Sequence, residues 1–105
     1  SLHDALPISA DPTTFMLHQN VPNPFNPVTQ LSFQVPDGGA TVSLRIYDVS
    51  GRLIRILVDG HEPAGVRTFS WDGRDDAGNP VASGTYFYQV AAPSFSETKK
   101  MLLLK

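Results

Sequence analysis

The sequence contains no cysteine, which excludes disulfides, thiolate metal sites and cysteine nucleophiles. Charged residues account for only 17% of it, and the formal net charge is −2. With so little charge and no basic patch, there is no electrostatic reason to expect nucleic acid or anionic lipid as a partner. Long apolar runs are also missing, since no window approaches the roughly 20 residues of a membrane span. We therefore expect neither nucleic-acid binding nor membrane insertion.

Residues suited to catalysis are scarce as well. Of the three histidines, His3 belongs to an unusual N-terminal stretch, and His18 and His61 lie in or beside expected loops. No Gly-x-Ser-x-Gly segment is present to hold a nucleophilic serine on a sharp turn. The sequence thus predicts a protein that is not an enzyme and needs no cofactor.

Residues 1–14 differ in character from the rest of the chain. They lack the positive charge and the apolar stretch of a secretory signal, so we expect any signal peptide on a missing N-terminal portion. Residues 1–9 resemble the conceptual translation of a common sequencing-library adapter, which suggests an assembly artefact. A native reading frame at the genomic locus would contradict this hypothesis. We expect residues 1–14 to be a non-native or disordered leader and residues 15–105 to form one domain.

Proline and glycine, in contrast, are abundant: nine prolines and eight glycines divide the chain into short segments. Between them, apolar and polar residues alternate with the period of two that is typical of half-buried antiparallel strands. The clearest alternating runs span 28–35, 41–48, 65–71 and 85–92. Less regular runs span 52–59, 95–104 and, very briefly, 16–19.

This pattern predicts a fold class. About seven short strands separated by frequent turns are typical of an all-β, immunoglobulin- or fibronectin-like antiparallel sandwich. The run 52–59 is apolar on both faces, which predicts a bulge or two-sided burial. We expect Trp71, Tyr86 and Tyr88 to be the bulky residues of the core.

A cluster of oxygen-bearing side chains follows Trp71. Asp72, Asp75, Asp76 and Asn79 could together offer ligands to a hard cation such as calcium. The spacing does not fit an EF-hand, because arginine and alanine occupy the third and sixth positions counted from Asp72. We favour a turn in which these side chains bond their own backbone, and keep a calcium site as the weaker alternative.

Exposed aromatic residues allow a second weak alternative. Tyr47, Phe87 and Phe95 are expected to point outward and could together form a flat platform for a sugar. Singly exposed aromatic side chains are common on protein surfaces, so this interpretation is not favoured.

The C-terminal segment is the most unusual part of the sequence, because a nearly all-apolar run is bracketed by lysines. Its residues are Lys99, Lys100, Met101, Leu102, Leu103, Leu104 and Lys105. A structural interpretation is a last strand buried by pairing, with lysines that keep its edge in water. A functional interpretation is that the same strand is also an address for other proteins, which dock on it, for example by strand addition.

Several ordered blocks resemble one known family. They are Asn-Val-Pro-Asn-Pro-Phe-Asn-Pro from Asn20, Leu-Arg-Ile-Tyr-Asp-Val-Ser-Gly-Arg from Leu44, Trp-Asp-Gly-Arg-Asp from Trp71, Pro-Val-Ala-Ser-Gly-Thr-Tyr from Pro80, and residues 99–105. The chain resembles the type A C-terminal sorting domain of the type IX (Por) secretion system. It is similar too to the immunoglobulin-like domain first named for the flagellar hook-capping protein.

The resemblance implies a function and a set of site residues. In sorting domains, the block matching Pro80, Gly84 and Tyr86 and the terminal block matching 99–105 mark the domain for export. The implied partners are the type IX secretion machinery, a sortase-like processing enzyme and an N-terminal cargo that is missing here. The implied location is outside the cell or on its surface, reached through the periplasm. The alternative is a structural hook-cap-like module that acts as a spacer or subunit contact.

The block of residues 23–27 has a structural interpretation. Its prolines stiffen the chain, and we expect Phe25 to plug one end of the sandwich.

Overall fold

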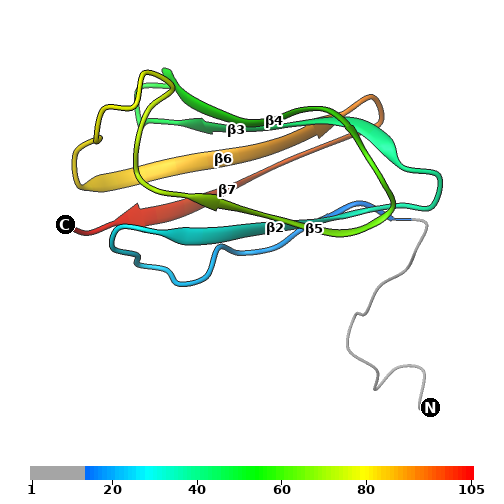
Figure 1. Ribbon diagram of the computed structural model, residues 1–105, viewed down its shortest axis with the longest axis horizontal. Coiled ribbons are helices and arrows are strands. Elements are labelled where there is room, and N and C mark those ends of the chain that lie inside the picture. The colour runs from blue at the N-terminus through cyan, green and yellow to red at the C-terminus, as the bar shows by residue number, and fades with distance from the viewer. Residues whose placement is uncertain (1–13) are drawn as a thin grey trace, which may run out of the picture.

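Seven antiparallel strands in two stacked sheets make up the computed structural model, which describes residues 14–105 (Figure 1). The strands are β1 (Met16–Leu17), β2 (Thr29–Val35), β3 (Ala40–Tyr47), β4 (Leu53–Glu62), β5 (Gly65–Trp71), β6 (Gly84–Ala92) and β7 (Phe95–Leu103). One sheet has the order β1-β2-β5 and the other has the order β4-β3-β6-β7. The predicted immunoglobulin-like sandwich is confirmed. Residues 14–105 contain no helix that is long and apolar enough to cross a membrane.

The core lies between the two sheets, where the alternating residues of each strand meet. On β6, for example, Tyr86, Tyr88 and Val90 are buried while the residues between them are partly exposed. Trp71 at the end of β5 is fully buried, as expected. Its ring meets that of Tyr86 edge-on at 5.3 Å, a geometry that aromatic pairs favour. The three expected aromatic core residues are confirmed.

Strand β4 departs from regular pairing at two positions. Leu44 pairs with Val58 and Arg45 with Ile56, so Leu57 is an extra residue, and a second shift follows near Ile54. These are the bulges predicted from apolar residues on both faces of the run. Because bulges bend and twist an edge strand, they also make β4 a poor template for pairing with another chain.

The first described strand, β1, begins at Met16, and Gln34 of β2 donates a hydrogen bond to the carbonyl of Thr14 at 2.9 Å. The interpretation of residues 1–9 as an artefact lies outside the described residues. So does almost all of the expected leader, residues 1–14. Lys105 lies at the opposite end of the sandwich from the start of β1 (Figure 1).

Candidate functional site

The structure brings together the two blocks that the resemblance singles out. Gly84 pairs with Leu103 and Tyr86 pairs with Met101, because β6 and β7 are antiparallel neighbours. The backbone N–H of Lys105 donates to the hydroxyl of Ser83 at 3.0 Å. The two blocks therefore form one continuous end of the four-stranded sheet.

The block from Pro80 to Tyr86 directs the chain into β6. The Tyr86 hydroxyl donates to the carbonyl of Ala82, four residues upstream, at 2.7 Å. This arrangement is the tyrosine corner known from other immunoglobulin-like sandwiches. Gly84 has a φ of +150°, a conformation that favours glycine. Burial raises the pKa of Tyr86. Pro80 is exposed, whereas Gly84 and Tyr86 serve the turn and the core.

Residues 99–105 divide into a buried part and an exposed part. Met101 and Leu103 face the core and are 1% and 0% exposed. The exposed members of the block are Lys100, Leu104 and Lys105, while Lys99 and Leu102 are half-buried. Lys99 pairs with Glu97 at 3.7 Å. Only the exposed members are fully accessible to another protein while the domain stays folded.

The outer edge of β7 is covered by residues 23–25. The backbone N–H of Leu102 donates to the side-chain oxygen of Asn23 at 3.0 Å. The N–H of Phe25 donates to the carbonyl of Leu102, and the N–H of Leu104 donates to the carbonyl of Phe25. A partner could add a strand here only by displacing Asn23 and Phe25, so the expected strand addition is obstructed at this end of β7.

The covering segment is fixed by Phe25. This side chain is 2% exposed and its ring lies 5.6 Å from that of Trp71. The prediction that Phe25 plugs one end of the sandwich is confirmed. Next to it, buried Asn20 donates through its side-chain nitrogen to the hydroxyl of Thr29 and to the carbonyl of Pro22, each at 3.0 Å.

Tyr88 connects the same segment to the centre of β6. Its hydroxyl donates to the carbonyl of His18 at 2.7 Å and accepts from the N–H of Asn20 at 2.8 Å. Burial raises the pKa of Tyr88 to about 12. The phenol is therefore a neutral structural hydrogen-bonding group.

The acidic loop after β5 is a turn, as favoured. One Asp75 oxygen accepts from the backbone N–H groups of Ala77 and Asn79, at 3.0 and 2.9 Å. Arg55 lies 3.3 Å from Asp72 and 3.7 Å from Asp76, so an arginine occupies the place a cation would take. Within residues 14–105, no group of three or more acidic, histidine or cysteine side chains is placed to hold a metal.

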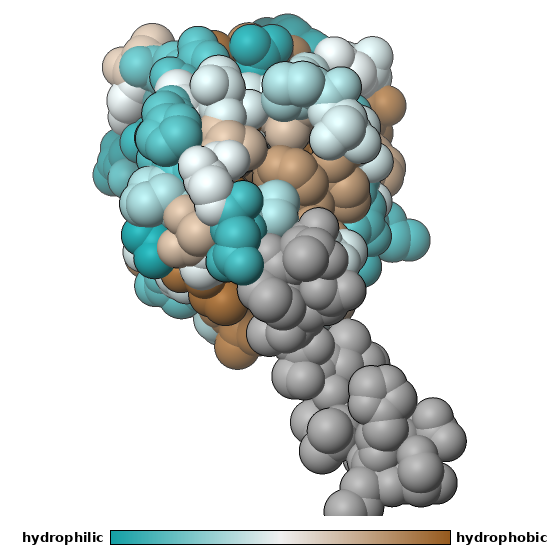
Figure 2. All heavy atoms as spheres, turned by 90° about the vertical axis from the view of Figure 1, so that its right-hand side faces the viewer, coloured by the Kyte–Doolittle hydropathy of each residue, from teal (hydrophilic) through white to brown (hydrophobic). Residues whose placement is uncertain are grey.

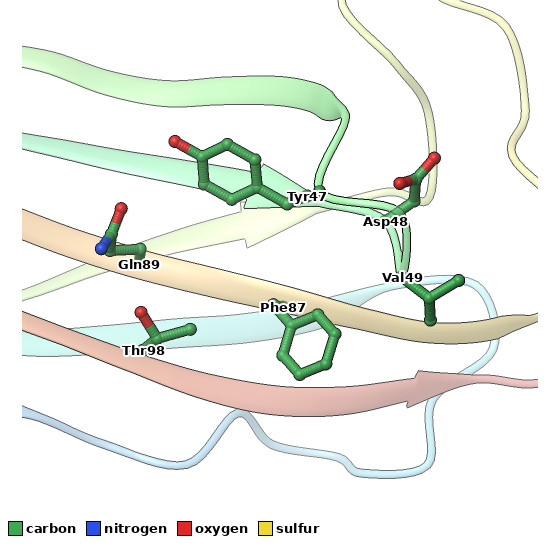
Figure 3. Close-up of a pocket in the computed structure, with 7 residues that line it drawn as sticks. Tyr47, Asp48, Val49, Phe87, Gln89 and Thr98 are labelled. Atoms are coloured by element: carbon green, nitrogen blue, oxygen red, sulfur yellow. The ribbon is translucent and has the colours of Figure 1, made fainter.

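The outer face of the four-stranded sheet carries a shallow depression (Figure 3). Tyr47 of β3 and Phe87 of β6 pair directly across the two strands and line it together. Gln89, Thr98 and the 48–51 turn complete its lining. The alternating pattern predicted the outward direction of both rings but not the hollow between them and the turn.

The third member of the expected aromatic platform lies elsewhere. Phe95 stands at the start of β7 and its ring stacks on Phe15 at 4.9 Å. Both side chains are partly buried against the core. Figure 2 shows the end of the sandwich where β1 begins, with apolar surface among polar residues. The prediction of one platform formed by Tyr47, Phe87 and Phe95 is wrong, because Phe95 lies on the side of β7 that faces the core.

Comparison with known proteins identifies the family. The family model described as the FlgD Ig-like domain matches residues 20–95, which is most of the chain. The chain belongs to this family. Two curated relatives, the basal-body rod modification proteins FlgD of Salmonella typhimurium and Salmonella typhi, are 41% identical to it over 51 residues. The aligned segment covers 49% of this chain but only 22% of each relative.

Solved structures with the same sandwich come from two kinds of protein. FlgD from P. aeruginosa has a TM-score of 0.56 and 27% identity, over 71% of this chain and 57% of that one. Dimeric latent PorU from Porphyromonas gingivalis has a TM-score of 0.70 and 20% identity, over 87% of this chain and 9% of that one. PorZ, a surface component of the type IX secretion system of the same bacterium, has a TM-score of 0.58 and 24% identity, over 85% of this chain and 11% of that one. At such low sequence identities, the likeness to PorU and PorZ shows a shared fold and nothing more.

The FlgD Ig-like family match covers one of the two candidate blocks. It includes Pro80, Gly84 and Tyr86, and it ends before residues 99–105. The tyrosine corner therefore belongs to the matched part of the domain, whereas the terminal strand lies beyond it.

Proposed function

We propose that this FlgD Ig-like domain is a non-catalytic C-terminal sorting and anchoring domain, which directs a secreted bacterial cargo across the outer membrane through the type IX secretion system. The observation that carries this proposal is the pairing of the two blocks that resemble sorting motifs. Residues 80–86 lead into the β6–β7 hairpin and residues 99–105 end it, so the two blocks lie side by side at one end of the four-stranded sheet.

The partners in this proposal are the secretion machinery, a sortase-like processing enzyme and a cargo that precedes the domain. The cargo reaches the outside of the cell or its surface through the periplasm. The fold likeness to PorZ, a surface component of that system, and to PorU is in keeping with the proposal. Neither likeness carries it alone, because both identities are below 25%.

The geometry limits how such an address can be read. Met101 and Leu103 are core residues, so a loose tail cannot present the terminal block while the domain is folded. The accessible features are Lys100, Leu104 and Lys105, beside the turn that contains Ser83. In this proposal the machinery recognises the folded end of the sheet.

A secretion assay tests the proposal. Residues 15–105 are fused behind a signal peptide and a fluorescent reporter in a bacterium that carries the type IX machinery, and in the same strain without it. The reporter is expected outside the cell only where both the domain and the machinery are present. Export that does not depend on the machinery, or retention of a folded fusion in the periplasm, would overturn the proposal.

Point variants keep folding and sorting apart in this assay. Leu104→Ser combined with Lys105→Ser changes exposed residues of the block and is expected to reduce export. Val66→Ser is the matched control, because Val66 is 54% exposed and lies on β5 of the other sheet, whereas Leu104 is 48% exposed. Equal export of both variants would show that the exposed residues at the end of the terminal block are not part of the sorting signal.

The second candidate is a structural module, a spacer or subunit contact like the domain of a hook-capping protein. The family match and the 41% identity to the Salmonella FlgD proteins favour it. It predicts that the fusion stays in the periplasm, folded, in both strains.

A further inference from the structure

An apolar row crosses the outer face of the four-stranded sheet near the end that holds residues 99–105. Leu53 of β4 pairs with Tyr47 of β3, and Tyr47 pairs with Phe87 of β6. Side chains directly opposite on neighbouring strands have Cβ atoms about 5 Å apart, so these three form a contiguous surface. With Val49 of the adjoining turn, we name these residues the outer patch; Figure 3 shows Tyr47, Val49 and Phe87.

The exposure of the outer patch is unusual for its residue types. Val49 is 73% exposed and Leu53 is 40% exposed, and both rings are only half-buried. Isolated exposed apolar residues need no explanation, but a contiguous group beside a depression is typical of protein–protein contact sites. Aromatic side chains are enriched at the centres of such sites.

The charge that the surroundings of the outer patch offer to a partner is positive. Lys100 of β7 pairs with Phe87 and is exposed on the outer face, next to the aromatic row. The one carboxylate that lines the depression, Asp48, accepts three hydrogen bonds from Ser50 and Arg52 within its own turn. Its other oxygen lies 3.4 Å from the guanidinium of Arg52, so these two charges form an ion pair within the turn. The charge left for a partner is therefore that of Lys100.

The outer patch is also continuous with the proposed address. Lys100 belongs to both, and Leu102, two residues further along β7, has the same outward phase and pairs with Thr85. An outer surface that extends from Leu53 to Leu102 would give a partner both aromatic anchors and access to the terminal block.

We infer that the outer patch is the docking surface for a protein of the export machinery, whose contact surface supplies apolar side chains for Tyr47 and Phe87 and a carboxylate for Lys100. The inference rests on the proposed sorting function and assigns it a face of the domain. The partner is a folded protein surface laid on a sheet face, which leaves residues 23–25 in place on the edge of β7.

Export of surface variants tests this inference. The double variant Val49→Asp with Leu53→Asp, and separately Lys100→Glu, are placed in the reporter fusion with residues 15–105. Each is expected to reduce the exported fraction tenfold or more, because each replaces a favourable contact with an uncompensated or repelling charge. The controls are Val66→Asp, a single change of the same kind, and Arg67→Glu, the same charge reversal, both on β5 of the other sheet. Circular dichroism checks that all variants fold.

The outcomes distinguish this inference from the function on which it rests. Loss of export in the patch variants alone, with folding intact, supports the inference. Normal export of the patch variants, while the intact domain is exported only with the machinery, overturns the inference and leaves the sorting function standing. Retention of the intact fusion overturns both. A wild-type domain that dimerises in sedimentation analysis, with monomeric patch variants, also overturns the inference, because the occupant is then a second copy.

Discussion

Single polar side chains connect distant parts of this domain. The Tyr88 hydroxyl joins β6 to His18 and Asn20, which lie about 70 residues earlier in the chain. Asn20 in turn connects to Thr29 through its side chain. Because these groups are buried, losing one partner leaves the others without a replacement from water.

Replacing Tyr88 with phenylalanine is expected to lower the free energy of unfolding at pH 7 by about 1–3 kcal/mol, since the carbonyl of His18 and the N–H of Asn20 lose their partner. The measurement is urea unfolding followed by circular dichroism. Tyr47→Phe, which removes a hydroxyl on the outer face, is the matched control. Equal midpoints for the two variants would contradict the buried network.

Tyr88 also predicts a loss of stability at high pH. Its pKa rises from an ordinary 10.0 to about 12 in the folded protein. The protonated phenol contributes fully to the stability of the fold below pH 10. Between pH 10 and pH 12 this contribution to the free energy of unfolding declines by about 1.4 kcal/mol per pH unit. Unfolding free energies between pH 9 and pH 12 should fall less steeply for Tyr88→Phe than for the wild type. Parallel curves would show that this phenol does not contribute.

Asp48 predicts the opposite dependence at low pH. The hydrogen bond from the Ser50 hydroxyl, with those from the backbone of Arg52 and Ser50, holds the pKa of Asp48 below its ordinary 3.8. A lowered value stabilises the fold above the ordinary pKa, and the contribution is lost as the pH falls through the lowered one. Asp48→Asn should therefore be less stable than wild type at pH 7, and the two should converge in acid. Exposed Asp37→Asn is the control for urea midpoints at pH 7, 5 and 3.

At the scale of single elements, the outer edge of β7 is covered by other parts of the chain. An edge strand presents unpaired backbone groups on which other chains can assemble. Here residues 23–25 bond the outward groups of Leu102 and the N–H of Leu104. The side chain of Gln19 bonds the carbonyl of Lys100 at 2.8 Å. The other edge strand of that sheet, β4, has bulges instead.

Removing the cover should make the domain less stable and more prone to assemble. Phe25→Ala is expected to cost about 3–5 kcal/mol, because a fully packed ring is lost. Asn23→Ala is expected to cost about 1 kcal/mol and to free the N–H of Leu102. Light scattering at rising concentration should show association for both, while exposed Asn26→Ala serves as the control. Monomeric behaviour of the Asn23 variant would argue against a protective role for this segment.

At the scale of the whole molecule, the sequence predicts where the strands are but not which strands lie next to each other in the sheets. The alternation of apolar and polar residues in 28–35, 41–48, 65–71 and 85–92 is local, so the sequence alone predicted those strands. The strand order and the cover of β7 depend on contacts between distant residues, which a local pattern does not contain. Run 95–104 alternates poorly because Leu102 and Leu104 are apolar although they lie on the outward side of β7.

The terminal strand belongs to the core, which decides what a truncation can report. A chain without residues 99–105 loses Met101 and Leu103, each worth about 2–5 kcal/mol in a packed core. Small domains have only about 5–15 kcal/mol in total, so we expect the truncated chain to be unfolded. Circular dichroism of the shortened domain tests this directly. A folded product would mean that the sandwich tolerates the loss of its edge strand.

The position of β7 has a further consequence for the timing of folding. Chains are synthesised and threaded through membranes from the N-terminus, so the residues that complete this core arrive after those of β1–β6. A chain interrupted anywhere before Met101 lacks part of the core and is therefore expected to stay unfolded. The domain can therefore fold only once its last strand has been synthesised or transported, so its folded state reports that this point has been reached.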